Sequence, residues 1–595
     1  MTAEPHNPLS NEERDAALRS LLSTTLRNVS RVAGLESGGR PLEPAATWFT
    51  AGPAESMGDG ETVKVPRRYY YPLQHFRAEE PRALLVHRLL GGALRLGRLH
   101  EEGRDGQVTA WTLRHLEHWL VDEETDPGST LGNISWYCKV KCKFCYQIGH
   151  PPELKSPRYT TPREEIETKI RYYRPERKQR LFHATNYDTN EILTYPGVVE
   201  LMHKLRAKTD RPFYNITTNG VPLTPQMISD LKPLLPFELG ISINSTNPGL
   251  RRKLMRDKQP EVAIESMRRL REENMPFLAS IVAWPEFTLE DLEQTIRDLD
   301  RIPPAEIRVC LPGYSKYFSA DPLFDRDEVW QGIVGLVRRL RDELTVPIIP
   351  LPSIYEEHLH DEFHNQPYVQ GVVPGSPAAR AGVQRGDVVA SANNVRLPHR
   401  PAARYALTKM HEEGVKLVWL KVLRDGAETD LVLREGSDSD FAFPYTRDLA
   451  VLHRMPYGLL LPQGLGHEVM GQVKQLAAHH RAERVLILTS TLMRRPMQLM
   501  LDQVGGIEGA DVEWAIPENR YLGPNIFMGD LLTVEDYVNF LREHQAAGHP
   551  RPDLVLIPGS AFSTWRRDIT GRTFYEIGRL TGLTVEMMQV TRIWA

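Results

Sequence analysis

The chain has 595 residues, with 77 acidic and 73 basic side chains and a formal net charge of −4. This balance gives no basic field of the kind that a dedicated nucleic-acid-binding protein carries. With 41% hydrophobic residues the chain can bury several cores, and its length predicts about three or four domains.

The amino-terminal segment shows no targeting signal, since Met1–Pro8 lacks a basic region followed by an apolar run. No apolar stretch in the sequence reaches the roughly 18 residues that a membrane span requires. We therefore expect a cytoplasmic protein without membrane attachment. Residues 1–128 are predicted to be a leader, rich in Pro, Gly, Ser and Glu at its start, and an accessory region without assigned chemistry.

Three cysteines, Cys138, Cys142 and Cys145, fall within eight residues. They supply three thiolates, whereas a cubane [4Fe–4S] cluster normally takes four, so one iron would be left open. A structural zinc ion is usually bound by four ligands from two closely spaced pairs of cysteine or histidine residues, and no second pair is nearby. Four cysteines in the whole chain exclude a disulfide framework. The spacing favours a cluster over zinc or unpaired core thiols, and an exposed cluster needs a reducing compartment.

Residues 129–355 alternate short apolar runs with amphipathic segments, which predicts repeated βα units around a parallel sheet. Strand-like runs occur within Arg180–His183, Phe213–Gly220, Leu239–Lys253, Phe277–Pro285 and Glu306–Tyr317. Ligands of such sheets gather at the carboxyl ends of the strands.

The cysteine loop and the motifs that follow it resemble the radical S-adenosylmethionine (SAM) superfamily. The resemblance implies a partial (β/α)₆ barrel, a [4Fe–4S] cluster on the three cysteines, and SAM bound to the open iron by its amino and carboxylate groups. It also implies reductive cleavage of SAM to methionine and a 5′-deoxyadenosyl radical. An electron donor such as flavodoxin or ferredoxin would supply the cluster.

The resemblance also assigns residues that contact SAM. Phe144, just before the third cysteine, matches the residue that packs near adenine. The segment Thr189–Pro196 is similar to the superfamily's Gly-Gly-Glu-Pro motif, although both glycines are replaced. We expect Glu191, with the backbone of Thr189 and Asn190, to hold the amino group of SAM. The alternative for this segment is a surface turn that caps a helix.

Further candidates lie where strands are expected to end. Thr217, Thr218 and Asn219 close one apolar run and are predicted to line the SAM pocket. Ser242 and Asn244 alternate along the next strand and so share a face. The resemblance implies that they contact the ribose hydroxyls and the carboxylate of SAM.

Four more side chains are possible participants. A guanidinium binds carboxylates bidentately, and we favour Arg252 over Arg251 for the SAM carboxylate, although both could be solvated helix residues. Glu306–Tyr317 is expected to supply the sixth strand of the barrel, and Cys310 lies near the end of that strand. It is by default an inert core thiol, but inside the barrel mouth it could donate a hydrogen atom to a substrate radical, as could Tyr314.

Residues 366–436 resemble a bacterial PDZ domain, because Tyr368–Val389 contains a Gly-Ser-Pro-Ala turn and a later Gly-Asp turn. A PDZ domain can add an extended peptide to its sheet edge. No carboxylate-binding loop is recognisable before the first strand, so docking of a peptide and docking of another domain remain open. Residues 445–595 resemble the uncharacterised carboxy-terminal domain of PDZ-containing radical SAM proteins and are predicted to be α/β.

We therefore expect an α/β protein that is a radical SAM enzyme acting on a peptide or natural-product substrate. The PDZ-like module and the lack of a basic surface favour this substrate class. Modification of a tRNA or nucleotide is the alternative reaction. A non-catalytic iron–sulfur binding or assembly protein, and a zinc-stabilised scaffold, are the alternatives from other classes.

Overall fold

The computed structural model describes residues 55–57, 61–63, 99–102, 108–111, 137–145, 149, 151, 163–172, 191–208, 215–318, 324–437, 440–453, 455–462, 464–465, 467–526, 529–562, 568–570 and 572–588. The expected strand Arg180–His183 and the candidate residues Thr189 and Asn190 lie outside them. Near the amino terminus, β1 (Glu55–Met57) pairs with β2 (Glu61–Val63), and β3 (Leu99–Glu102) pairs with β4 (Val108–Trp111), both antiparallel.

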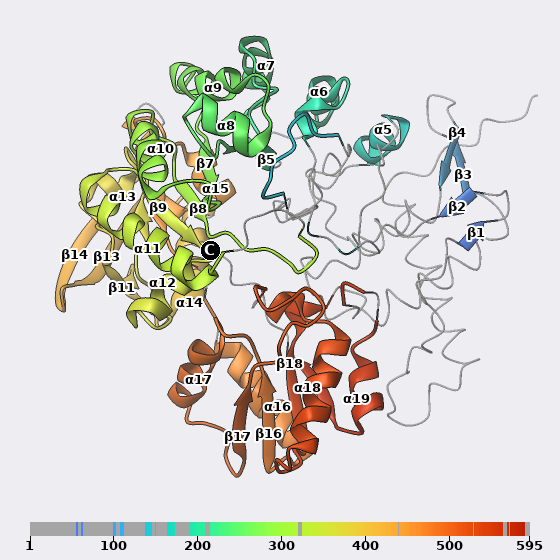
Figure 1. The fold of residues 1–595 in the computed structure, drawn as a ribbon. Coiled ribbons are helices and arrows are strands. Elements are labelled where there is room, and N and C mark those ends of the chain that lie inside the picture. The colour runs from blue at the N-terminus through green and yellow to red at the C-terminus, as the bar shows by residue number, and fades with distance from the viewer. Residues whose placement is uncertain are drawn as a thin grey trace, which may run out of the picture.

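The central unit is a parallel sheet of five strands in the order β5-β6-β7-β8-β9. The strands are β5 (Asn215–Thr218), β6 (Glu238–Ser242), β7 (Leu278–Val282), β8 (Ile307–Cys310) and β9 (Ile348–Leu351). Each strand pairs with the next one along the chain, and helices form the connections (Figure 1). This arrangement confirms the α/β class with a barrel-type parallel sheet.

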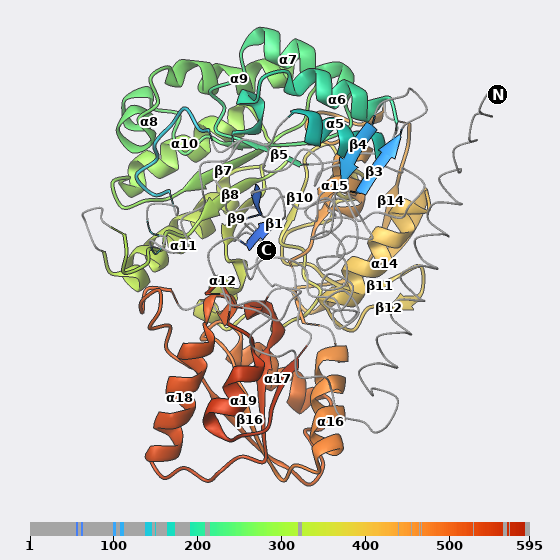
Figure 2. The ribbon, with the colours of Figure 1, turned by 90° about the vertical axis from the view of Figure 1, so that its right-hand side faces the viewer.

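Amphipathic helices cover the outer side of this sheet (Figure 2). They are α5 (Arg163–Tyr172), α6 (Val198–Arg206), α7 (Pro225–Leu231), α8 (Pro248–Met255), α9 (Pro260–Glu272), α10 (Leu289–Arg301), α11 (Arg326–Glu343) and α12 (Ser353–His360). Thr288 begins α10 with a capping box shared with Asp291. Strand residues such as Ile241 and Ile281 are fully buried against these helices. Burial of each such side chain adds about 1.5–3 kcal/mol to the free energy of unfolding.

The next unit confirms the predicted β-rich module. Its antiparallel sheet has the order β12-β11-β13-β14. The elements are α13 (Pro377–Arg380), β11 (Val388–Ala392), β12 (Val395–Arg396), α14 (Arg400–Glu412), β13 (Leu417–Arg424) and β14 (Ala427–Arg434). Gly386 has φ +91°, a backbone region that suits glycine. The buried carboxylate of Asp387 accepts two hydrogen bonds from Arg424, each 2.8 Å long.

A downstream segment adds a strand next to the PDZ-like sequence. After α15 (Arg447–His453), β15 (Leu459–Leu460) pairs antiparallel with β10 (Gly371–Val372). Tyr457, Leu459 and Leu461 are buried in the core of the PDZ-like module. The same stretch packs on the barrel through Tyr445 and Leu449. Residues 445–461 therefore join the barrel to the PDZ-like module.

The C-terminal domain, residues 467–588, has its own parallel sheet in the order β17-β16-β18-β19 (Figure 1). Its strands are β16 (Arg484–Leu488), β17 (Asp511–Ala515), β18 (Leu554–Pro558) and β19 (Val585–Met588). Two separate apolar cores, one on each face of the sheet, hold α16 (His467–His480) with α17 (Arg494–Gln503), and α18 (Val534–Ala546) with α19 (Tyr575–Thr581). Within the described part of the chain, no helix is long and apolar enough to cross a membrane.

Candidate active site

The cysteine loop, residues 137–145, is anchored on the end of α8. The backbone N–H groups of Lys141 and Lys143 donate to the carbonyls of Met255 and Leu254, both at 2.8 Å. The last carbonyls of a helix have no partner within the helix, so the loop satisfies groups that would otherwise need water. Val140 is buried in a small apolar cluster with the same two helix residues. The loop is thus held by backbone bonds and by packing.

None of the three cysteines of this loop forms a disulfide, and all three are partly buried. Burial raises the pKa of Cys138 to about 11 and also raises the pKa of Cys142, with a smaller contribution from Cys145. Asn219 Nδ2 donates a hydrogen bond to Cys138 Sγ at 3.4 Å. Thiols with raised pKa values, as at Cys138 and Cys142, need a positive metal centre to hold their thiolate forms. This donor set fits an iron–sulfur cluster.

Glu191 lies beside the cysteine loop and is 2% exposed. Its Oε2 accepts from the backbone N–H of Asn219 at 2.7 Å, and its own N–H donates to the carbonyl of Tyr137 at 3.3 Å. Its Oε1 is buried and has no hydrogen-bond partner among the described residues. Burial raises the pKa of Glu191 to about 7. A buried carboxylate oxygen without a partner fits a ligand amino group, as in SAM.

The two candidate arginines have different surroundings. Arg251 is fully buried and its Nε donates to Asp257 at 2.7 Å. Its other nitrogens donate to the carbonyls of Asn219, Ser242 and Ile243. Arg251 therefore ties the carboxyl ends of β5 and β6 together.

Arg252 was the favoured partner for the SAM carboxylate. The structure places its side chain half exposed, in an ion pair with Glu261 at 2.5 Å. Such a pair is typical of the solvated face of a helix. The structure therefore does not bring Arg252 to the cysteines, because successive helix residues point in different directions and Arg251 takes the inward one.

Polar side chains alternate with buried aliphatic ones along the sheet. Thr217 on β5, Ser242 on β6, Ser280 on β7 and Cys310 on β8 retain exposure, whereas their strand neighbours are buried against the helices. Ser242 pairs in register with Ser280, and Cys310 Sγ lies 3.7 Å from Ser280 Oγ. These residues form a polar row on the inner face of the sheet.

Asn244 takes a different position from the one expected. It has φ 55° and its Oδ1 accepts from the backbone N–H of Val282 at 2.8 Å. Its Nδ2 donates to Met255 Sδ at 3.3 Å. Asn244 thus holds β6, β7 and α8 together just beneath the cysteine loop.

The remaining candidates lie around the loop that follows β8. Burial raises the pKa of Cys310, which keeps the thiol protonated. The Tyr314 hydroxyl donates to the carbonyl of Phe324 at 3.2 Å, and the two rings pack edge to face. Phe144 packs against the apolar cluster that contains Trp284. Both aromatic candidates therefore lie in the same region as the cysteine loop.

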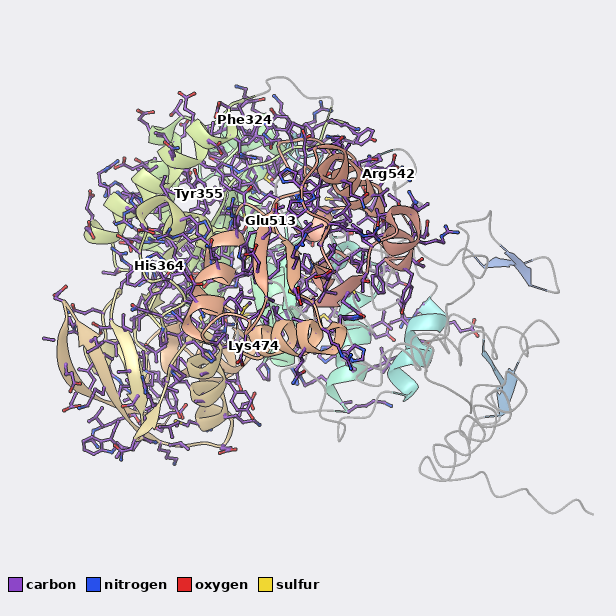
Figure 3. The ribbon with its side chains drawn as sticks, turned by 90° about the horizontal axis from the view of Figure 1, so that it is seen from below. Phe324, Tyr355, His364, Lys474, Glu513 and Arg542 are labelled. Carbon is purple, nitrogen blue, oxygen red and sulfur yellow. The ribbon has the colours of Figure 1, made fainter. Side chains whose placement is uncertain are left out.

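The C-terminal domain contacts this region through residues 519–526, here called the docking loop. Lys316 N–H donates to the carbonyl of Leu522 at 2.6 Å, and Lys316 Nζ donates to that of Arg520 at 2.7 Å. Gly523 has φ +103°, and a Cβ there would lie 3.1 Å from Lys316 Cβ. The docking loop therefore approaches the loop after β8 too closely for a larger residue. The C-terminal domain lies below the barrel in Figure 1, so in the view from below it overlaps the barrel (Figure 3).

Residues 133–299 match the profile of the radical SAM superfamily. The chain therefore carries a radical SAM domain. Residues 368–424 match a PDZ domain, so a PDZ domain follows the radical SAM domain along the chain. The superfamily implies the use of SAM and an iron–sulfur cluster. No curated protein matches the chain.

Solved structures with similarity to the chain include three of SuiB from Streptococcus suis. SuiB bound to the precursor peptide SuiA is 15% identical, with a TM-score of 0.28, and the match covers 36% of this chain and 47% of that one. SuiB bound to SAM is 14% identical, with a TM-score of 0.28 and coverages of 36% and 48%. A further SuiB structure has 14% identity, a TM-score of 0.27 and coverages of 36% and 47%. The matched part of this chain thus spans about half the length of SuiB.

Sequence reasoning did not identify Ser280, Asp257 or the docking loop. The alternation within Phe277–Val282 could have placed Ser280 on the inner face beside Ser242. Asp257 follows a helix end and gave no local signal that it would be buried against Arg251. The docking loop acts across domains, and no local pattern predicts such a contact.

Proposed function

We propose that this radical SAM enzyme cleaves SAM reductively at a [4Fe–4S] cluster and abstracts hydrogen from a peptide or natural-product substrate. The observation that supports this most is the proximity of three thiols on one anchored loop to the unpartnered Oε1 of Glu191. A cluster bound by Cys138, Cys142 and Cys145 would supply the electron that converts SAM to methionine and a 5′-deoxyadenosyl radical.

The chain's own residues position SAM in this proposal. Glu191 accepts from the amino group of SAM through its free oxygen. Asn219 contacts both the SAM-binding carboxylate and a cluster cysteine. Its backbone N–H donates a hydrogen bond to Glu191, and its side chain donates one to Cys138. Arg251 holds the strand ends beneath them. The roles of Thr189 and Asn190 toward the amino group, and of Phe144 near adenine, stay predictions from the resemblance.

The polar row of the inner face would contact the substrate or the ribose. Thr217 and Ser242 offer hydroxyl groups there. Cys310 holds its thiol proton at neutral pH, so it can return a hydrogen atom to a substrate radical. Tyr314 is the second candidate donor, although its hydroxyl is bonded to a backbone carbonyl. The docking loop helps to keep water from this region, which protects a reactive intermediate.

The PDZ domain and the absence of an overall basic charge favour a peptide substrate over a tRNA. One edge of β10 is already paired with β15, so a docked peptide would have to use another edge of the module. A flavodoxin or ferredoxin in the cytoplasm would supply the electron. The domain boundaries at 128, 355, 366, 436 and 445 also remain predictions.

The test is anaerobic reconstitution of the protein with iron and sulfide, followed by SAM and dithionite. We expect 5′-deoxyadenosine, quantified by mass spectrometry, from the wild type. A variant with Cys138→Ala, Cys142→Ala and Cys145→Ala should give none. If a fully loaded wild type binds SAM but produces no 5′-deoxyadenosine, a non-catalytic iron–sulfur role replaces the proposal.

A further inference from the structure

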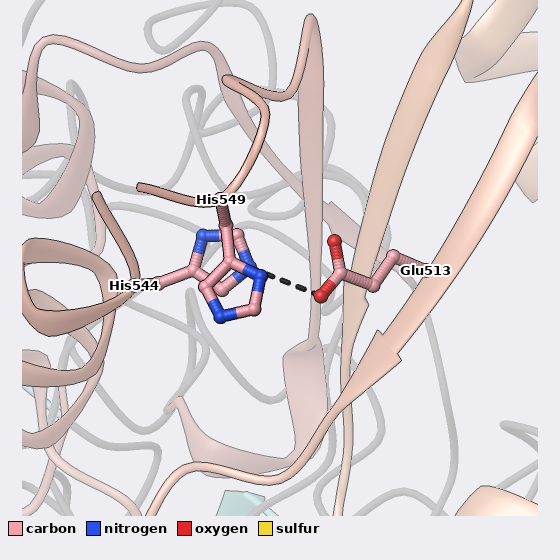
Figure 4. A group of neighbouring side chains, drawn as sticks. All are labelled: Glu513, His544 and His549. Atoms are coloured by element: carbon pink, nitrogen blue, oxygen red, sulfur yellow. Dashed lines mark hydrogen bonds and ion pairs between the residues drawn. The ribbon is translucent and has the colours of Figure 1, made fainter. Parts of the chain in front are cut away.

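Two histidines and a glutamate meet in the C-terminal domain, far along the chain from the cysteine loop. Their potential ligand atoms all lie within 4.8 Å of one another. His544 Nε2 lies 3.1 Å from Glu513 Oε1, and the rings of His544 and His549 stack with centroids 4.3 Å apart (Figure 4). His544 is buried, whereas Glu513 and His549 are exposed.

The local fold explains how these three residues meet. Along β17, Val512 and Trp514 pack on the α16 and α17 side of the sheet, so the alternation of a strand turns Glu513 toward α18. His544 lies in the last turns of α18. Gly548 then has φ +77° and no atom near its Cβ position, and this left-handed residue reverses the chain after the helix. The reversal places His549 over His544.

We propose that Glu513, His544 and His549 bind a divalent transition-metal ion, with Zn²⁺ as the best match. Two imidazoles and one carboxylate form a typical three-ligand zinc set, with a fourth position for solvent. Mg²⁺ and Ca²⁺ prefer sites made of oxygen ligands, so nitrogen ligands select against them. The His544–Glu513 hydrogen bond explains that pair, whereas His549 contributes a third, exposed donor next to it through its stack on His544. A shared ion accounts for all three.

To bind zinc, His549 has to turn out of its stack on His544, because two parallel imidazole rings cannot both point a nitrogen lone pair at one ion. Ligands at about 2.0–2.2 Å from a tetrahedral ion lie roughly 3.3–3.6 Å apart, and the present limit is 4.8 Å. Rotation of the two exposed side chains, Glu513 and His549, can supply the difference. Buried His544 would remain fixed and define the position of the ion.

The position of the site indicates a stabilising role. α18 begins beside the docking loop, because Asp536 near its first turn accepts from the N–H groups of Arg520 and Tyr521. His544 lies at the opposite end of the helix. This end is away from the carboxyl ends of the strands, where parallel α/β sheets usually bind their ligands. An ion there would join the edge strand β17 to α18, the two elements that flank the docking loop. Zinc would then favour the folded C-terminal domain.

The test titrates Zn²⁺ into the full chain carrying Cys138→Ala, Cys142→Ala and Cys145→Ala, so that the cluster thiols cannot compete. Calorimetry should show about one tight equivalent, and the midpoint of thermal unfolding should rise with Zn²⁺. Adding Glu513→Gln or His549→Asn should remove that equivalent and the thermal shift. Both positions are exposed, so these variants are expected to fold.

A matched control lies in the same domain. His480 Nε2 is 3.0 Å from Glu586 Oε1, and the neighbouring His479 ring packs edge to face with it. His480→Asn should leave zinc binding unchanged. The proposal is overturned if the parent chain binds no zinc at micromolar concentration. It is also overturned if Glu513→Gln and His549→Asn bind zinc as the parent does.

Discussion

The backbone N–H of Tyr314 donates a hydrogen bond of 3.0 Å to Asn525 Oδ1, across 211 residues of sequence. This bond joins the loop after β8 to the docking loop of the C-terminal domain. Lys316 and Leu522 add a backbone bond between the same two loops. The C-terminal domain therefore helps to determine the position of the loop that carries Tyr314.

Asn525→Ala should loosen this contact without unfolding either domain. Loss of one hydrogen bond of about 1.5 kcal/mol should raise the hydrogen-exchange rate of the amides in 314–317 roughly tenfold. Mass spectrometry of peptic fragments measures this exchange rate. Gln545→Ala, which removes a distant bond from α18 to Thr581, is the control and should leave these amides unchanged. Equal exchange in Asn525→Ala and the wild type would contradict the role of the bond.

Arg251→Met should be strongly destabilising, because it leaves Asp257 buried without its partner. Breaking one side of a buried ion pair costs about 3–5 kcal/mol. The neighbouring change Arg252→Met removes an exposed pair and should cost less than about 1 kcal/mol. Urea unfolding of the metal-free chain compares the two. If both variants lost a similar amount of unfolding free energy, the buried Arg251–Asp257 pair would not be the stronger of the two interactions.

The contrast between these two arginines shows what the sequence can predict. The parallel sheet was predictable because each strand is a short apolar run between amphipathic helices, and the cysteine spacing by itself predicts a cluster-binding loop. The choice between Arg251 and Arg252 depends on which side of α8 faces the strand ends. That rotation is fixed by tertiary contacts with Asn219 and Asp257. No local pattern contains it.

The pairing of β10 with β15 could not be predicted from the sequence, for a related reason. A two-residue strand has no periodicity, and its partner lies beyond the whole PDZ-like sheet. No sequence pattern near Gly371 and Val372 indicates that Leu459 and Leu460 pair with them. Contacts between distant segments depend on how complete units pack, as they do at Asn525.

The pKa of Glu191 gives a pH dependence that can be measured without any cofactor. Burial raises this pKa from 4.5 to about 7, so the folded state holds a proton that the unfolded state releases. Stability from this group is complete below about pH 4.5 and declines as pH rises toward 7, by on the order of 2–3 kcal/mol. Urea unfolding between pH 4.5 and 7.5 should show this decline in the wild type. Glu191→Gln should lack that component, and parallel pH profiles for the two proteins would refute it.

Gly458 tests whether the β15 segment is part of the PDZ-like core. It has φ +87°, and a Cβ there would collide with the buried side chain of Ser376. Gly458→Ala should therefore lower the free energy of unfolding in two ways. A left-handed alanine is strained, and overpacking against Ser376 costs about 1–3 kcal/mol more. Gly382→Ala is the matched control, because Gly382 has φ +77° but no atom near its Cβ position.

Chemical unfolding that monitors Trp419 on β13 should give a lower midpoint for Gly458→Ala than for Gly382→Ala. The strain of a positive φ is common to both variants, so their difference isolates the contact with Ser376. Since Ser376 caps α13 and Gly458 directly precedes β15, a clear difference means that the downstream segment folds together with the module. Equal midpoints would mean that residues 455–461 detach without cost, and the PDZ-like core would then end at β14.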